Sequence, residues 1–281
     1  MRAGPDSGES MTEHIIPGGV PAMPLKSYLS RAYPLLNARD VLKKRDVKVN
    51  GVRRDGDFAV RGGDEVRIYA DIDMSIAVAG FSGGLLAVIK PQGLPVDADA
   101  QGIGADTALS RARLIAPGAE LCHRRDAQTG GILILATETG ALKSALAAFK
   151  EHRVEKSYTA IVRGRFDAPR GLYRDYLRKD PVKATVRIVP PGRGALTVET
   201  RWKVVEDMGG LSRMELEPVT GRTHQLRAHM AHYGHPILGD DKYGDRSLNR
   251  EMRTRLCLWC SRVAIGGGTF AADAPDWLGR G

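Results

Sequence analysis

Residues 221–244 read GRTHQLRAHMAHYGHPILGDDKYG. Thr223 is typical of a helix N-cap and Gly234 of a helix end, so we predict a helix over residues 224–233. Apolar residues recur inside it at helical spacing, and we expect them to face the core: Leu226, Met230 and Tyr233. The stretch therefore predicts a short amphipathic helix followed by a polar loop.

The opposite face of this helix carries polar side chains near its N-terminus. His224 and Arg227 are three residues apart and share that face. An arginine beside the positive end of a helix favours the binding of a carboxylate or a phosphate. Four histidines of the stretch could instead suggest a metal: His224, His229, His232 and His235. They lack the one-turn spacing of a metalloprotease pair, so we predict no metal site.

A second stretch, residues 122–131, reads CHRRDAQTGG and precedes the apolar run ILILA at 132–136. Asp126 thus lies in a loop that leads into a buried strand, and catalytic groups often lie in such loops. The two glycines allow a close backbone approach, and Thr129 can hydrogen-bond the loop. Nearby cations would lower the pKa of Asp126 and keep it ionised. Spacing alone leaves open the alternative that Asp126 only caps a turn or pairs with a neighbouring arginine.

A third stretch, residues 156–164, reads KSYTAIVRG and alternates as a strand does. Tyr158 shares one face with Ala160 and Val162, and on this evidence alone it would be a packing residue. Two-residue periodicity returns at Leu196, Val198, Trp202 and Val204. Such a register predicts antiparallel strands with one covered face. Leu142, Leu146 and Phe149 mark one further helix. Because strands and helices are both expected, the large domain is predicted to be α+β with a mixed, mainly antiparallel sheet.

The N-terminal part of the chain carries most of the positive charge. The protein has 42 Lys+Arg against 33 Asp+Glu, a net charge of +9, and residues 26–54 supply +7 of it. Two short helices, the hairpin signal Asn50-Gly51 and a closing strand predict a small α+β module over 24–72. A solvated helix face is the alternative, but we favour binding of an RNA backbone. The residues expected to do so are Lys26, Arg39, Lys43, Lys44, Arg45 and Lys48.

This module resembles the α-L RNA-binding domain of ribosomal proteins and RNA-modifying enzymes. We expect a disordered tail over 1–23, the module over 24–72 and a catalytic domain over 73–281. The tail has no basic-then-apolar order, so it is not a secretory signal. No apolar run reaches the ~18 residues that a membrane helix needs. Three cysteines do not suggest a disulfide framework, and a cytoplasmic location is expected.

The three stretches together resemble the RluA-type family of pseudouridine synthases, with support from residues 89–95, IKPQGLP. The resemblance implies a pseudouridine synthase fold and gives roles to particular residues. Asp126 matches the catalytic aspartate, Tyr158 the tyrosine that stacks on the target base and moves a proton, and Arg227 the basic partner of the aspartate. Arg124 matches the arginine that enters the space left by the flipped nucleotide. The expected substrate-binding residues are Arg124, Thr129, Arg222, His224 and Leu226.

The chain departs from that family at two positions. The family usually has Leu where this chain has Arg125, and Ser where it has Gly130. We therefore keep two hypotheses. The first is an enzyme that isomerises uridine in structured RNA to pseudouridine by flipping the base, with ribosomal RNA favoured and tRNA as the alternative substrate. The second is a catalytically impaired RNA-binding or ribosome-assembly protein with the same fold.

The reaction adds no atom and removes none, so no cofactor is expected, and the chain shows no phosphate-cradling glycine motif. A monomer would suffice. A kinase is excluded because the His-Arg-Arg-Asp string lacks an Asn five residues after the Asp, where Gly131 stands. A serine hydrolase is excluded because no Gly-x-Ser-x-Gly elbow occurs.

Overall fold

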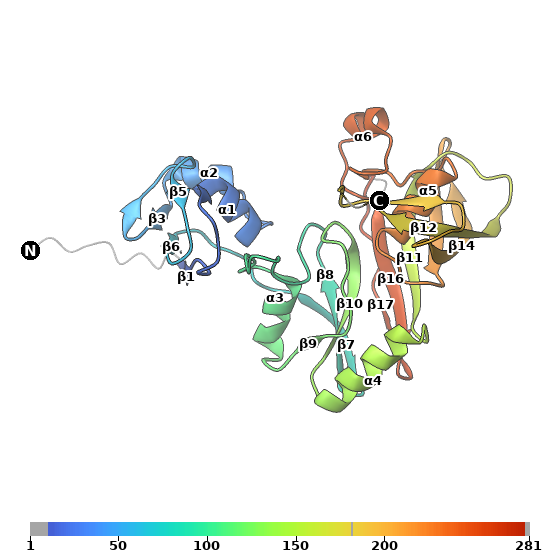
Figure 1. The fold of residues 1–281 in the computed structure, drawn as a ribbon, viewed down its shortest axis with the longest axis horizontal. Helices are drawn as coiled ribbons and strands as arrows, with labels where there is room; N and C mark the ends of the chain where they lie inside the picture. Colours follow the sequence, from blue (N-terminus) through green and yellow to red (C-terminus); the bar gives the residue numbers. More distant parts are fainter. Residues whose placement is uncertain (1–10, 181, 279–281) are drawn as a thin grey trace, which may run out of the picture. The chain divides into compact units, whose positions relative to one another are not determined.

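The computed structural model describes residues 11–180 and 182–278. The chain divides into two compact units. The first is formed by the chain up to Ile76 together with Gly93–Pro117, and the second by Ala77–Gln92 together with the chain from Gly118 onward (Figure 1). No helix within the described ranges is long and apolar enough to cross a membrane.

The first unit is a small α+β module. Its elements are β1 (Thr12–Ile15), β2 (Met23–Pro24), α1 (Leu25–Ala32), α2 (Ala38–Lys44), β3 (Val47–Val49), β4 (Val52–Arg53), β5 (Ala59–Val60), β6 (Glu65–Ile68) and α3 (Ala108–Ile115). Four strands form a sheet in the order β1-β6-β3-β4, and β2 pairs with β5. The predicted helices and the hairpin at Asn50-Gly51 are present, and the Asn37 side chain caps α2 as its sequence position suggested.

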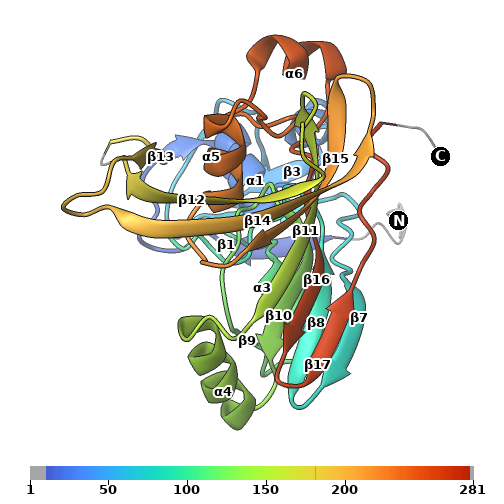
Figure 2. The ribbon, with the colours of Figure 1, turned by 90° about the vertical axis from the view of Figure 1, so that its right-hand side faces the viewer.

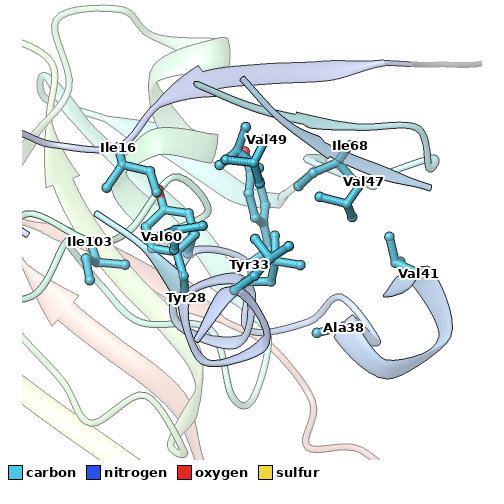
Figure 3. Packing of buried hydrophobic residues seen from close by; sticks show 14 of the residues in the cluster. Ile16, Tyr28, Tyr33, Ala38, Val41, Val47, Val49, Val60, Ile68 and Ile103 are labelled. Atoms are coloured by element: carbon cyan, nitrogen blue, oxygen red, sulfur yellow. The ribbon is translucent and has the colours of Figure 1, made fainter. Parts of the chain in front are cut away.

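The core of the first unit is built where the helices meet this sheet. Tyr28 and Tyr33 from α1 and its end pack with Val47, Val49 and other buried residues (Figure 3). The alternation of Val47 and Val49 places both on the covered face, and the intervening Lys48 lies at the edge of the core with its ammonium over the Tyr69 ring. The local sequence pattern therefore accounts for this part of the fold.

The expected tail over residues 1–23 is wrong for the part that the structure describes. β1 pairs antiparallel with β6, and Ile16 is fully buried. His14 lies between two tyrosine hydroxyls, 2.7 Å from Tyr28 and 2.9 Å from Tyr33. A four-residue strand has too little periodicity to stand out in a sequence, and its stability comes from these distant partners. Residues 1–10 lie outside the described residues.

The expected domain boundary near residue 72 also needs correction. The first unit continues to Ile76 and later takes back Gly93–Pro117. Ile103 packs in its core, the Asp106 amide donates to the Ala32 carbonyl over 2.8 Å, and Arg31 pairs with Asp99 at 2.5 Å. These contacts join segments about 70 residues apart, so a linear division of the sequence misses them.

The second unit is built on a large mixed sheet. Its elements are β7 (Ala77–Ser82), β8 (Leu85–Lys90), β9 (Glu120–Leu121), β10 (Gly130–Ala136), α4 (Thr139–Lys150), β11 (Glu155–Arg163), β12 (Arg170–Lys179), β13 (Val186–Val189), β14 (Leu196–Asp207), β15 (Leu211–Pro218), α5 (Gln225–His232), α6 (Arg246–Met252), β16 (Leu258–Ile265) and β17 (Gly268–Ala271). The strand order is β13-β12-β14-β15-β11-β16-β10-β8-β7, with β17 beside β16 and β9 beside β10 (Figure 2).

The sheet is mainly antiparallel, as predicted, and β10 with β16 forms its parallel pair. Every residue of β10 is buried, which explains its unbroken apolar run. α5 packs against β13, β14 and β15. The predicted face of α4 is partly wrong, because Leu146 is exposed and the buried residues are Ala145 and Ala148. All three cysteines are free and buried, so Cys257 and Cys260 pack in the interior of this unit.

Candidate active site

The loop that carries Asp126 lies between β9 and β10 and is fixed by backbone and side-chain bonds. The Thr129 amide donates to the Asp126 carbonyl over 3.1 Å. The ammonium of Lys90, the last residue of β8, donates to the Ala127 carbonyl over 2.8 Å. Burial, and after it the charge of Arg125, lowers the pKa of Lys90 to about 7. The loop is thus held at the residue directly after Asp126.

The two glycines of the loop are required by close packing. A Cβ on Gly130 would come within 2.4 Å of the Trp259 ring, and one on Gly131 within 2.2 Å of the Cys260 carbonyl. Gly131 also has φ +97°, which side chains rarely adopt. Where the RluA-type pattern has Ser, this chain therefore has Gly130 because Trp259 fills the space. The departure at position 130 has a packing reason.

The N-terminus of α5 differs from the prediction. The N-cap is His224, in a left-handed conformation with φ 50°, and it makes no side-chain cap bond; Thr223 is not the cap. Gln225 anchors the turn instead. Its Oε1 accepts from the Arg222 amide over 3.0 Å, and its Nε2 donates to the Glu199 carbonyl over 2.7 Å. A buried amide with both ends satisfied holds the turn more firmly than a single hydroxyl cap would.

Arg227 is shared among three carboxylates. It contacts Asp126 from Nη1 at 3.3 Å, binds both oxygens of the buried Asp240 at 2.8 and 2.7 Å, and reaches Asp241 at 2.8 Å. Burial opposes the guanidinium charge, but the hydrogen bonds and charge of Asp240, followed by the charges of Asp126 and Asp241, raise the pKa of Arg227. The predicted pairing of Arg227 with Asp126 is present, and Asp240 sets the orientation of the guanidinium.

His224 approaches the same carboxylate from a second direction. Its Nε2 lies 3.5 Å from Asp126 Oδ2, and its Nδ1 lies 2.9 Å from the Tyr243 hydroxyl. That hydroxyl accepts from the Val186 amide over 2.7 Å, so its own proton is free to go to Nδ1. Burial lowers the pKa of His224, and burial raises that of Tyr243. A neutral ring bonded in this way carries its proton on Nε2, toward Asp126.

Tyr158 lies on β11, at the point where the register with β16 shifts. The guanidinium carbon of Arg125 lies 5.5 Å from the centre of its ring. Burial raises the pKa of Tyr158, and the charge of Asp126 acts on it in the same direction, so the phenol is protonated at neutral pH. The ring is therefore a protonated aromatic surface that lines the cavity beside the Arg125 guanidinium.

These groups line one cavity of about 570 Å³. It brings together all eight residues expected to act in catalysis or substrate binding: Arg124, Asp126, Thr129, Tyr158, Arg222, His224, Leu226 and Arg227. Asp126 is one-quarter exposed, with a side-chain accessibility of 27%, so a substrate can reach it while Arg227 stays buried. The structure thus joins Asp126 to Arg227, which lies 101 positions away in the sequence.

The residues expected to bind an RNA backbone belong to the first unit. Arg39, Lys43, Lys44 and Arg45 are exposed on α2 and its C-terminal end, as predicted for that face. Lys26 and Lys48 are partly buried. Within the ranges that the structure describes, no three side chains of His, Cys, Asp or Glu are grouped so that they could hold a metal ion. His229 is instead buried beside Thr200, with 2.8 Å between Nδ1 and Oγ1.

Sequence reasoning missed three residues that support the site. Asp240 and Tyr243 lie in the stretch 221–244. Asp240 could have been identified from the sequence, because a buried arginine such as Arg227 requires an acidic partner. Tyr243 gave no signal beyond its place in the stretch. Lys90, in the IKPQGLP motif, gave only the hint that a lysine follows a fully apolar strand.

Comparison with known proteins shows the family of this chain. The model of the RNA pseudouridylate synthase family matches residues 84–232, which is more than half of the chain. The chain is also similar to the ribosomal large subunit pseudouridine synthase C of Vibrio cholerae, with 34% identity over 231 residues, 74% of this chain and 72% of that protein. The Escherichia coli K12 protein of the same name is 32% identical over 75% of this chain and 72% of its own length.

A solved structure shares the fold. Human RNA pseudouridylate synthase domain containing 1 superposes with a TM-score of 0.61 and 28% identity, covering 72% of this chain and 84% of that one. The chain therefore belongs to the RNA pseudouridylate synthase family, and the predicted membership and fold class are confirmed.

Proposed function

We propose that this protein isomerises uridine to pseudouridine in structured RNA, with Asp126 as the reacting carboxylate. The observation that carries the proposal is the Asp126 side chain itself. It is accessible from the cavity, yet contacts a buried arginine at 3.3 Å and a neutral histidine at 3.5 Å. Charged and neutral donors fixed beforehand around a carboxylate stabilise it without reorganisation during the reaction.

The reaction breaks the bond between N1 and the ribose and joins the ribose to carbon 5 of the same base. Because that base is stacked in folded RNA, it must be flipped into the cavity, at a cost of a few kcal/mol. Stacking on the Tyr158 ring offsets about 1–3 kcal/mol of that cost. Arg124, which is exposed at the cavity, would fill the vacated stack. Asp126 then acts as nucleophile or as base at the sugar.

After the base has rotated, the proton on carbon 5 must leave. Tyr158 is our candidate for moving it. Since the buried phenol is protonated at neutral pH, it would take the proton from carbon 5 only as it gives its own proton to N1, which gains one once its bond to the ribose has broken. Arg227 would keep Asp126 oriented throughout, because Asp240 fixes the guanidinium from the opposite side.

Two observations support ribosomal RNA as the substrate. The bacterial relatives carry names that place their action on the ribosomal large subunit. The exposed cations of α2 provide a surface that can bind an RNA backbone. Cytoplasmic location and a monomeric state stay predictions. Mapping of pseudouridines across total RNA, with and without the gene, should show one or a few sites lost from the large-subunit RNA.

The substitution Asp126→Asn tests the reacting group. Release of tritium from RNA labelled at carbon 5 of uridine should fall by at least about 1,000-fold, while RNA affinity changes little, because the amide keeps the shape but not the charge. Asp207→Asn is the matched control, since Asp207 is exposed and pairs with Arg165 outside the cavity. Full turnover by the Asp126 variant would reject the assignment. Absence of tritium release by the unmodified protein would favour the non-catalytic RNA-binding alternative.

A further inference from the structure

Between residues 150 and 156, where α4 ends and β11 begins, basic and acidic side chains lie in different places. Lys150, His152 and Lys156 line the cavity. The acids between them do not line it and pair elsewhere: Glu151 with Arg153 at 2.7 Å, and Glu155 with Arg262 at 3.4 Å. Two lysines and a histidine from one short segment therefore meet at the cavity wall, while the two glutamates pair with arginines that do not line it.

Arg125, which also lines the cavity, has side-chain nitrogens that are buried but poorly hydrogen-bonded. Its Nη1 makes one long contact, 3.4 Å from the Gly130 carbonyl. Its Nε and Nη2 are buried and make no hydrogen bond of normal geometry in the described part of the chain. The Tyr158 phenol and the Cys260 thiol, a weak acceptor, are near enough to interact with its charge. Leaving charged donors unpaired costs about 1–3 kcal/mol or more, so a buried group of this kind calls for an explanation.

The cations of the wall also disfavour one another. Burial, with the charge of Arg125 acting in the same direction, lowers the pKa of Lys156. Lys156 lies over the Phe149 ring, with 5.8 Å between Nζ and the ring centre, which gives it a fixed position. Among the described residues that line the cavity, the one carboxylate is Asp126, and it is engaged with Arg227. The wall thus has an excess of positive charge that an incoming anion would neutralise.

We propose that Arg125, Lys150, His152 and Lys156 form a subsite for a backbone phosphate of the RNA, next to the nucleotide whose base enters the cavity. This inference rests on the proposed function. RNA carries a phosphate on each side of every internal nucleotide, so the flipped uridine brings this anion to the cavity. A volume of about 570 Å³ falls in the range of pockets that enclose whole ligands and leaves room beside a pyrimidine. Arg125 is then a substrate-binding residue, and its unpaired donors are satisfied when the phosphate arrives.

The test combines substitutions in the protein with a change in the RNA. Short RNAs that contain the mapped target uridine are made with a neutral methylphosphonate at one linkage at a time. Loss of one charge-assisted contact, worth about 1.5–3 kcal/mol, corresponds to roughly a tenfold or greater loss of affinity. For the unmodified protein we expect this loss at one linkage beside the target. Lys156→Met and Arg125→Leu should show a similar loss with natural RNA.

The decisive measurement combines each substitution in the protein with the methylphosphonate RNA. With the methylphosphonate RNA, Lys156→Met and Arg125→Leu should lose little further affinity, because the partner charge is already gone. Each variant should also reduce the dependence of Kd on salt by about one counterion. Lys143→Met is the control: Lys143 is exposed on the same helix α4, does not line the cavity and should respond to methylphosphonate as the unmodified protein does.

Two results would overturn the subsite. One is the absence of any sensitive linkage beside the target uridine. The other is that the protein and RNA changes weaken binding independently, so that their effects on Kd multiply. Because Kd needs no turnover, the subsite stays testable even with a protein that releases no tritium. Tritium release by the unmodified protein reports separately on the proposed function.

Discussion

The two units of the protein each hold an arginine with buried nitrogens, and the two arginines are satisfied to opposite degrees. In the first unit, Arg111 binds both oxygens of Asp106, at 2.6 and 2.9 Å, and donates to the Ser75 carbonyl over 2.6 Å. Asp106 is 1% exposed and Arg111 4% exposed. In the second unit, Arg125 has one long hydrogen bond, and two of its buried nitrogens have no hydrogen-bond partner among the residues that the structure describes.

This contrast separates two uses of a buried charge. Where a charge only joins segments, as Arg111 joins α3 to the residues before it, folding leads to complete pairing, because an unpaired charge would be costly. At a binding site, incomplete pairing of a buried cation favours the ligand, because the ligand can form the hydrogen bonds that the cation does not form within the protein. Arg227 lies between the two cases, because Asp240 holds it completely while Nη1 remains for Asp126.

The largest effect is expected from breaking the complete pair. Arg111→Leu leaves the Asp106 carboxylate buried without a cation and should lower the free energy of unfolding by about 3–5 kcal/mol. Urea denaturation followed by far-UV circular dichroism measures the loss. The double variant Asp106→Leu with Arg111→Leu should recover most of it, because no buried charge remains. A small loss in the single variant would show that Arg111 is not needed to compensate Asp106.

Local patterns predicted those parts of the protein whose stability is itself local. The buried run that became β10, the alternation of β14 and the Asn50-Gly51 hairpin carry their signals within a few residues. The Asp126 loop and the helix with Arg227 could each be found from their own residues. Their meeting in one cavity followed only from the family resemblance, because periodicity says nothing of contacts 101 residues apart.

The features that were missed depend on distant partners. β1 is stabilised by β6 and by two tyrosine hydroxyls around His14, and α3 by residues before Ile76. The left-handed His224 at the start of α5 is fixed by Gln225 and by Tyr243, neither of which a capping pattern includes. Sequence reasoning therefore located the reactive groups better than the residues that hold them in place.

A second, smaller effect concerns the buried His229, whose Nε2 makes no hydrogen bond in the described part of the chain and lies 3.6 Å from the Asp175 carboxylate. His229 is fully buried, and burial lowers its pKa to about 4, against about 6.5 when unfolded. The unfolded chain therefore binds a proton between these values that the folded chain does not. Stability from this residue is complete above about pH 6.5 and falls as pH drops toward 4, by up to about 3 kcal/mol. Urea midpoints across this range should show the slope.

Substitution assigns that slope to one residue. In His229→Gln the change in unfolding free energy between pH 6.5 and 4 should shrink, because glutamine does not titrate. The exposed His232→Gln on the same helix is the control and should keep most of the slope of the unmodified protein, because burial is the main cause of the low pKa of His229 and the charge of His232 only adds to it. An unchanged slope in His229→Gln would mean that the pH dependence arises from other groups.

The smallest effect has the opposite sign and tests the incomplete pairing directly. Arg125→Leu removes two buried donors without a partner, at the loss of one long hydrogen bond and of the contact with the Tyr158 ring, which is worth about 0.5–2 kcal/mol. We therefore expect the free energy of unfolding to rise by about 1 kcal/mol, read as a higher urea midpoint at unchanged slope. The same variant should bind RNA more weakly, so stability and affinity move in opposite directions. A variant that loses both would show that Arg125 supports the folded site as Arg111 supports the first unit, and the contrast between the two arginines would disappear.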